Sequence, residues 1–189
     1  MDHGNLHADR GETDNALADY NSAISLDPSF AMAYLNRGNL YAAKGDVERA
    51  LADYDRAILL QADYPAAYLD RGNVYGDKGD SERAFADYDK ALALDPDFIP
   101  AYIARGEFYQ QQGCSELAIE DYNKAFALSS NDPNVYVRLG SDFDGLGQKE
   151  KATISFQKVL ESSADKDTIA WAKLQLRKLA AKAKNSKTR

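Results

Sequence analysis

The stretch RGNLYAAKGD, residues 37–46, recurs 34 positions later as RGNVYGDKGD, residues 71–80. When Ala31 is numbered register position 1 and the chain is read in steps of 34, the pattern continues through five copies. Position 20 is always alanine, and position 24 is always aromatic. Positions 8 and 15 are always glycine: Gly4, Gly38, Gly72, Gly106 and Gly140, then Gly11, Gly45, Gly79, Gly113 and Gly147. Repetition at this period predicts an array of structural units, each of which buries its apolar face against its neighbours.

Each repeat reads as two helices joined at a glycine. Residues 32–44 and 48–61 both carry aromatic and small side chains at spacings of three and four, which share one helical face. Between them, Gly45 suits the left-handed conformation that closes a helix, and an acid follows it, as suits the start of the next helix. The prolines fall at repeat boundaries: Pro28, Pro65, Pro96, Pro100 and Pro133. A mid-helix glycine costs about 1 kcal/mol relative to alanine. We therefore expect Gly38 to face Ala50, so that the two helices pack backbone to backbone.

Register positions 7 and 23 change together. The three middle copies pair arginine with aspartate: Arg37 and Asp53, Arg71 and Asp87, Arg105 and Asp121. The last copy has Leu139 and Ser155, and the first sets His3 opposite Asp19. Antiparallel packing brings these positions together, so we infer an Arg–Asp pair inside each middle repeat. A buried pair would cost about 3–5 kcal/mol to break from one side, and a solvated pair contributes less than about 1 kcal/mol. The sequence leaves both readings open.

The period also predicts the domain organisation. We expect a partial first repeat at residues 1–30, repeats at 31–64, 65–98, 99–132 and 133–164, a capping helix at 165–184 and a disordered tail at 185–189. The first copy begins part-way through its first helix, which indicates a truncated repeat or a domain cut from a longer protein. The capping helix carries an apolar stripe from Ile169 to Ala183, and we expect Trp171 to pack on the last repeat.

Charge divides the chain unevenly. Residues 166–189 carry a net charge of +7, which leaves −14 on residues 1–165 of a chain whose total is −7. A basic tail can bind nucleic acid or anionic lipid. No aromatic platform accompanies these bases, so we favour the solvated face of a capping helix and do not expect a nucleic-acid partner. The sequence has no apolar run near the ~20 residues of a membrane span and no secretory signal, so a cytoplasmic location is the default expectation.

Helix–turn–helix units of 34 residues, with aromatic, glycine, aromatic, glycine, alanine, aromatic, alanine and proline in that order, resemble the tetratricopeptide repeat (TPR) family. The resemblance covers residues 1 to 164 and, in its Arg–Gly–Asn form of repeat, is similar to bacterial members. It implies an all-α fold, a right-handed α-solenoid of stacked antiparallel helix pairs with a C-terminal capping helix. Position 7 departs from the family pattern, because the family usually has leucine where this chain has arginine.

The same resemblance implies a non-catalytic protein–protein interaction module that holds a peptide or helical segment in its concave groove. By analogy, register positions 2, 5, 6, 9, 12 and 13 face that groove. Asparagine at position 9 offers a donor and an acceptor to a peptide backbone, and acidic neighbours favour a partner with basic residues. The expected groove residues are Asn36, Asn39, Asp70, Asn73, Asp77, Glu107 and Arg138. The Lys/Arg clamp with which some members hold a C-terminal carboxylate is not matched.

Two other function classes are weighed against peptide binding. One is a structural scaffold that forms a homodimer through its incomplete N-terminal repeat. The other is an enzyme or metal protein, because His3 and His7 have the i, i+4 spacing of metal ligands. These histidines occupy the columns of Arg37 and Tyr41, which favours a degraded repeat instead. The sequence has no phosphate loop, CxxC pair or Ser/His/Asp set, so we expect no catalytic residues, no metal site and no cofactor.

Overall fold

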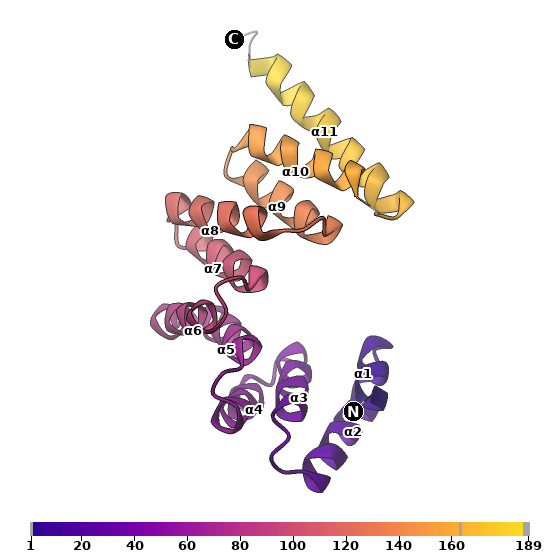
Figure 1. The fold of residues 1–189 in the computed structure, drawn as a ribbon, viewed down its shortest axis with the longest axis vertical. Helices are drawn as coiled ribbons and strands as arrows, with labels where there is room; N and C mark the ends of the chain where they lie inside the picture. Colours follow the sequence, from indigo (N-terminus) through magenta and orange to yellow (C-terminus); the bar gives the residue numbers. More distant parts are fainter. Residues whose placement is uncertain (1, 163, 187–189) are drawn as a thin grey trace. The chain divides into compact units, whose positions relative to one another are not determined.

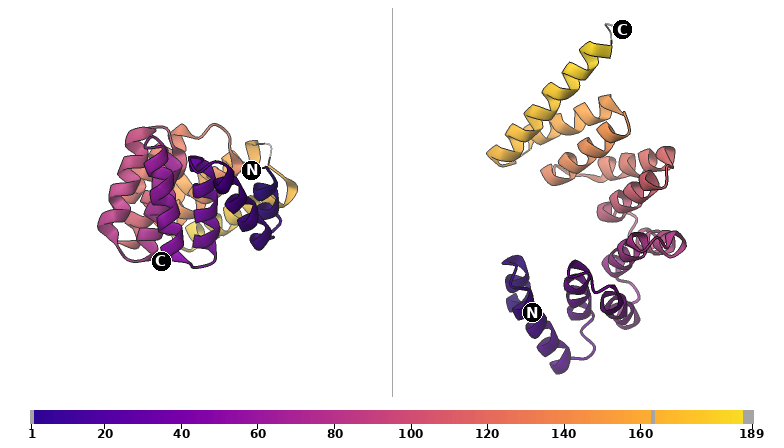
Figure 2. Two further views of the ribbon diagram at one scale, coloured as in Figure 1. Left: turned by 90° about the horizontal axis from the view of Figure 1, so that it is seen from below. Right: turned by 180° about the vertical axis from the view of Figure 1, so that it is seen from behind.

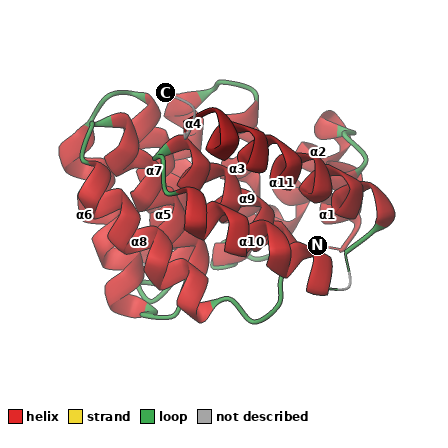
Figure 3. Ribbon diagram, turned by 90° about the horizontal axis from the view of Figure 1, so that it is seen from above, coloured by secondary structure: helices red, strands yellow, loops and turns green. Residues whose placement is uncertain are grey.

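A computed structural model describes residues 2–162 and 164–186, and within them the chain is helix and loop without a strand (Figures 1 and 3). This confirms the all-α class. Contacts divide the chain into two units, Met1–Ala101 and Tyr102–Arg189. The first unit holds α1 (Asp2–Asp9), α2 (Thr13–Leu26), α3 (Ala31–Ala43), α4 (Val47–Leu60), α5 (Pro65–Asp77) and α6 (Ser81–Leu94). The second holds most of α7 (Ile99–Gln111), with α8 (Ser115–Leu128), α9 (Pro133–Gly145), α10 (Lys149–Glu161) and α11 (Lys166–Ser186).

Within each unit the helices pack as pairs in the order of the repeats, as in an α-solenoid (Figure 2). Pro65 and Pro133 stand in the first turns of α5 and α9, where proline costs no helical hydrogen bond. Of the residues expected to form a disordered tail, Asn185 and Ser186 are the last two of α11, and residues 187–189 lie outside the described residues. None of the described helices is both long and apolar enough to cross a membrane.

The turn inside each repeat is closed by the glycine at position 15. All five of these glycines have positive φ, between 71° and 78°. The amide of Gly45 donates to the carbonyl of Ala42, and the amide of Asp46 donates to the carbonyl of Tyr41, each at 2.9 Å. These two bonds form a Schellman motif. The carboxylate of Asp46 then accepts from the amide of Arg49 at 3.3 Å and caps α4. Because Asp46 is the cap, both helices lie one residue earlier than predicted.

The glycine at position 8 faces an aromatic ring. A Cβ built on Gly38 would lie 2.7 Å from Cε1 of Tyr54 and 3.3 Å from Cβ of Asp53. The expected partner, Ala50, is therefore wrong as the closest neighbour, although Ala50 is fully buried. The ring of Tyr54 crosses α3 at the glycine on its way to Asn39, which its hydroxyl reaches at 2.8 Å. Glycine is required there because any side chain would occupy the path of the ring.

The last helix, α11, packs on α10 of the final repeat. The ring of Trp171 packs edge-on against Phe156 at a centroid distance of 5.5 Å, as expected. Ala172 and Leu179 are buried, but Ala183, predicted to end the apolar stripe, is exposed. The stripe was predicted too long because α10 has 13 residues and α11 has 21, so α10 is too short to cover the end of α11.

Candidate functional site

In each of the three middle repeats, a buried ion pair joins the first helix to the second. In the three middle repeats, the arginine at position 7 donates from Nε and Nη2 to both oxygens of the aspartate at position 23, at 2.7–2.8 Å. The three aspartates are only 5–6% exposed, which decides for the buried reading of the pair. Such a bidentate arrangement is the strong form of a charged hydrogen bond. The predicted counterpart in the first copy involves the side chain of His3, which lies outside the described residues.

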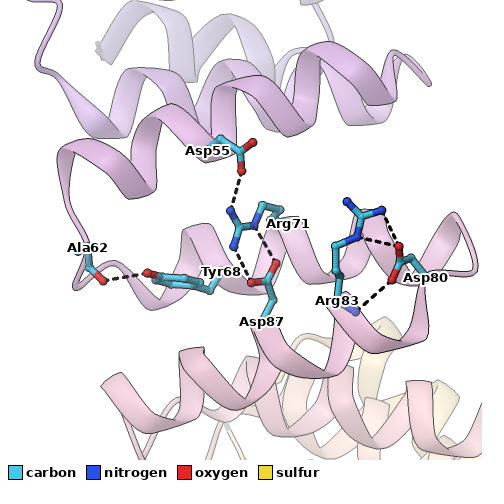
Figure 4. Close-up of polar contacts among 7 residues, drawn as sticks. All are labelled: Asp55, Ala62, Tyr68, Arg71, Asp80, Arg83 and Asp87. Atoms are coloured by element: carbon cyan, nitrogen blue, oxygen red, sulfur yellow. Dashed lines mark hydrogen bonds and ion pairs between the residues drawn. The ribbon is translucent and has the colours of Figure 1, made fainter.

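Arg37 and Arg71 also reach the preceding repeat, a contact that the sequence analysis missed. Nη1 of Arg71 donates to Asp55 of α4 at 2.6 Å, while the rest of the guanidinium holds Asp87 (Figure 4). Arg37 makes the same third bond to Asn21 of α2, also at 2.6 Å. The sequence feature that could have predicted this contact is the polar residue at register position 25 of the preceding repeat. These bonds tie the first helix of a repeat to the second helix of the preceding repeat.

The predicted groove residues of the first unit lie on α3 and α5. The hydroxyl of Tyr54 donates to Oδ1 of Asn39 at 2.8 Å, and that of Tyr88 donates to Oδ1 of Asn73 at 3.0 Å. Both asparagines remain exposed. Each tyrosine hydroxyl therefore uses one of the two lone pairs of the asparagine oxygen. The tyrosine therefore fixes the orientation of the carboxamide.

The neighbours of these asparagines differ between repeats. Nδ2 of Asn36 donates to Oδ1 of Asn5 at 3.0 Å. A hydrogen bond joins Asn39 to Asp70, so part of the Asn39 donor capacity is used as well. Burial raises the pKa of the Asp70 carboxyl to about 6, and the bond from Asn39 opposes that rise. Among the described residues, no acceptor contacts Nδ2 of Asn73. Asp77 is exposed at the end of α5.

The two predicted residues of the second unit pair with each other. Arg138 of α9 donates from Nε and Nη2 to the two carboxylate oxygens of Glu107 of α7, at 2.7 and 2.5 Å. Their charges cancel, so Glu107 does not stand as the free acid that the sequence analysis used to favour a basic partner. The acidic preference of the candidate groove therefore comes from the first unit.

Asp142 is a residue beside this pair that the sequence analysis missed. It stands at register position 10, where earlier copies have Leu40, Val74 and Phe108, and this break in an apolar column was the signal. One of its carboxylate oxygens, Oδ2, is buried without a hydrogen-bond donor among the described residues. The pKa of the Asp142 carboxyl is raised to about 7, chiefly by burial and further by the carboxylate of Glu107, while Arg138 opposes the rise.

We expect Asp142→Asn to make the protein more stable at pH 8 than the wild type. The folded-state pKa lies above the unfolded value of about 3.9. Between about pH 4 and pH 7 the folded wild type therefore holds a proton that the unfolded chain has released, and its stability falls as the pH rises across this range. Allowing for solvent screening, the gain at pH 8 should be about 1–2 kcal/mol, vanishing near pH 4. Urea unfolding from pH 4 to 8 measures it. Asp63→Asn, at an exposed residue, is the control. If the free energy of unfolding depends on pH in the same way for the wild type and for Asp142→Asn, the raised pKa of Asp142 is wrong.

Comparison with known families gives matches along most of the chain. Residues 4–45, 38–79 and 72–113 match the family model described as TPR repeat. Residues 99–132 and 133–166 match the model described as tetratricopeptide repeat. A search of curated proteins gave no match.

Several solved structures are similar to this chain. The crystal structure of MamA is 25% identical, with 85% of this chain and 94% of that chain covered and a TM-score of 0.64. A thermophilic TPR protein from Thermus thermophilus is 20% identical, with coverage of 94% and 95% and a TM-score of 0.76. YrrB, described as a TPR protein with an unusual peptide-binding site, is 22% identical, with coverage of 90% and 88% and a TM-score of 0.55. The last two likenesses support the fold alone.

Proposed function

Because the chain belongs to the tetratricopeptide repeat family, whose repeats serve as protein–protein interaction modules, we propose that it binds an extended peptide segment of a partner in a groove lined by α3 and α5. The observation that carries this proposal is the fixed carboxamide of Asn73. Its oxygen is held by Tyr88, its side chain is exposed, and its Nδ2 hydrogens have no acceptor within the described residues.

The chemistry of this surface suits a peptide main chain. A carboxamide that is already oriented loses little side-chain entropy when it donates to a carbonyl oxygen. Asn39 repeats the arrangement one repeat earlier, with Tyr54 as the anchor. Backbone carbonyls recur in every peptide, so this contact accepts many sequences. Side-chain preference then comes from Asp70 and Asp77, whose carboxyl groups favour lysine or arginine in the partner.

The test uses a peptide selected on the full chain from a displayed random library, titrated by calorimetry. We expect Asn39→Ala with Asn73→Ala to weaken binding by about tenfold or more, because two hydrogen bonds of about 1 kcal/mol each are lost. Circular dichroism should show an unchanged helical content, since both side chains are exposed. Asn15→Ala, at an exposed asparagine of α2, is the matched control and should bind as the wild type does.

Repeating the titration at several salt concentrations tests how much charge contributes to peptide affinity. Binding should weaken between low and moderate ionic strength, because carboxylates contribute, but it should persist, because the carboxamide contacts are neutral. Equal affinities for the wild type and the double variant would place the peptide elsewhere on the chain. A chain that selects no peptide and elutes as a dimer would instead support the self-associating scaffold.

A further inference from the structure

In two repeats, the arginine at position 7 fills a space, called the arginine socket below, between an aromatic ring and a polar residue of the preceding repeat. The guanidinium of Arg37 lies 5.9 Å from the ring centre of Tyr41 at position 11 and bonds Asn21 at position 25 of the preceding repeat. Arg71 lies at the same distance from Tyr75 and bonds Asp55. An aromatic ring at position 11 and a polar residue at position 25 are thus two walls of this socket, and the guanidinium occupies the space that they border.

The last repeat keeps these walls but has lost the arginine. Position 7 is Leu139 and position 23 is Ser155, both fully buried, and Oγ of Ser155 has no hydrogen-bond partner among the described residues. A pocket of about 170 Å³ lies beside the residues that correspond to the walls of the socket. It is lined by Asn123, Phe126, Phe143, Lys151 and Ile154. Asn123 holds position 25 and Phe143 holds position 11, so the pocket corresponds to the arginine socket of the middle repeats.

The lining of the pocket defines what it can hold. Phe126, Phe143 and Ile154 give it apolar walls. Nζ of Lys151 donates to Oδ1 of Asn123 at 2.7 Å and lies 5.5 Å from the ring centre of Phe143. The ammonium therefore contacts both walls, Asn123 and Phe143, and the pocket remains beside it. The volume is below the 300–1,000 Å³ typical of pockets for drug-sized ligands and suits a single side chain.

We propose that this pocket is a second binding site, which takes a leucine- or phenylalanine-sized apolar side chain of a protein partner with a carboxylate next to it. The apolar walls provide the burial, and the ammonium of Lys151 selects the neighbouring carboxylate. A basic side chain is excluded, because Lys151 repels it and because Ser155 replaces the aspartate that holds the guanidinium in the middle repeats. All the pocket residues belong to the second unit, so this site is independent of the groove on α3 and α5.

The test is an NMR titration of the full, isotope-labelled chain with N-acetyl-leucine and N-acetyl-phenylalanine. We expect shifts at the methyl groups of Ile154 and the rings of Phe126 and Phe143. N-acetyl-leucine should bind at least about tenfold more tightly than N-acetylglycine, which lacks the apolar side chain. N-acetyl-leucine amide, which lacks the carboxylate, should bind up to about fivefold more weakly than the acid. Equal binding of the glycine and leucine compounds, or shifts only at other residues, would overturn the proposal.

A variant that refills the socket sharpens the test. Leu139→Arg with Ser155→Asp restores the arginine and aspartate of the middle repeats, and should lower leucine-probe affinity about tenfold or more while the helical content stays unchanged. Unaltered affinity would overturn the proposal. If that variant does not fold, Ile154→Ala removes one apolar wall from an exposed position and should weaken the probe several-fold. Asn73→Ala, in the other unit, should leave the probe affinity unchanged, which separates this site from the groove.

Discussion

Arg71→Leu is expected to lower the free energy of unfolding by about 3–5 kcal/mol, the largest effect of any single change considered. The substitution leaves the carboxylate of Asp87 buried without its guanidinium, and Asp87 is only 5% exposed. It also removes the bond to Asp55, which ties the repeat to its neighbour. Urea unfolding followed by circular dichroism measures the loss. Arg83→Leu is the control, because its pair with Asp80 is exposed, and its unfolding curve should stay close to that of the wild type (Figure 4).

The last repeat supplies the compensating change. Because it is built with Leu139 and Ser155, Arg71→Leu combined with Asp87→Ser should recover much of the stability that Arg71→Leu alone loses. In a double-mutant cycle the two changes should therefore be strongly non-additive. If the two losses simply add, the pair does not act as a unit, and its role in holding the first helices is wrong.

Gly38→Leu should be the second most damaging change. A Cβ at this position already lies 2.7 Å from the ring of Tyr54, so a larger side chain must displace the ring. Overpacking costs about 1–3 kcal/mol, and displacement of the ring also breaks the bond that orients Asn39. We expect a lower melting temperature and weaker binding of the selected peptide.

Gly145→Ala is the matched control for this prediction. A Cβ on Gly145 would meet only Nε2 of Gln110, at an ordinary 3.5 Å, and alanine favours a helix by up to about 1 kcal/mol over glycine. The melting temperature of this control should be unchanged or raised. A Gly38→Leu protein that melts with the wild type would mean that the ring does not cross α3 at the glycine.

The period of 34 was sufficient to predict the fold, because local chemistry repeats with it. The glycine at position 15 closes the first helix in every copy, and the joint change at positions 7 and 23 was enough to infer the ion pairs. The column of small residues, in contrast, predicted close packing but not its partner. Which side chain crosses Gly38 depends on the length of Tyr54 and on the acceptor that its hydroxyl reaches, and no spacing rule contains either.

The candidate sites were harder to predict because they depend on departures from the repeat. Exposed asparagines at position 9 follow from the register, but the use of their oxygens by tyrosine is a contact between two helices. Asp142 is a single polar residue in a column that is otherwise apolar. How deeply it is buried depends on the side chains that pack around it, and the register does not give those. The pocket of the last repeat combines side chains from α8, α9 and α10. Such a pocket has no sequence pattern of its own.

The most direct test of peptide binding in the groove is to observe the asparagine side chains themselves. In ¹⁵N-labelled protein, the Nδ2 hydrogens of Asn39 and Asn73 give resolved signals that report on their hydrogen bonds. On addition of the selected peptide, we predict a large shift of the Asn73 side-chain signal and a smaller shift at Asn39, whose donor already contacts Asp70. Saturating peptide that leaves both signals unmoved, while residues outside α3 and α5 shift, would contradict the proposed site.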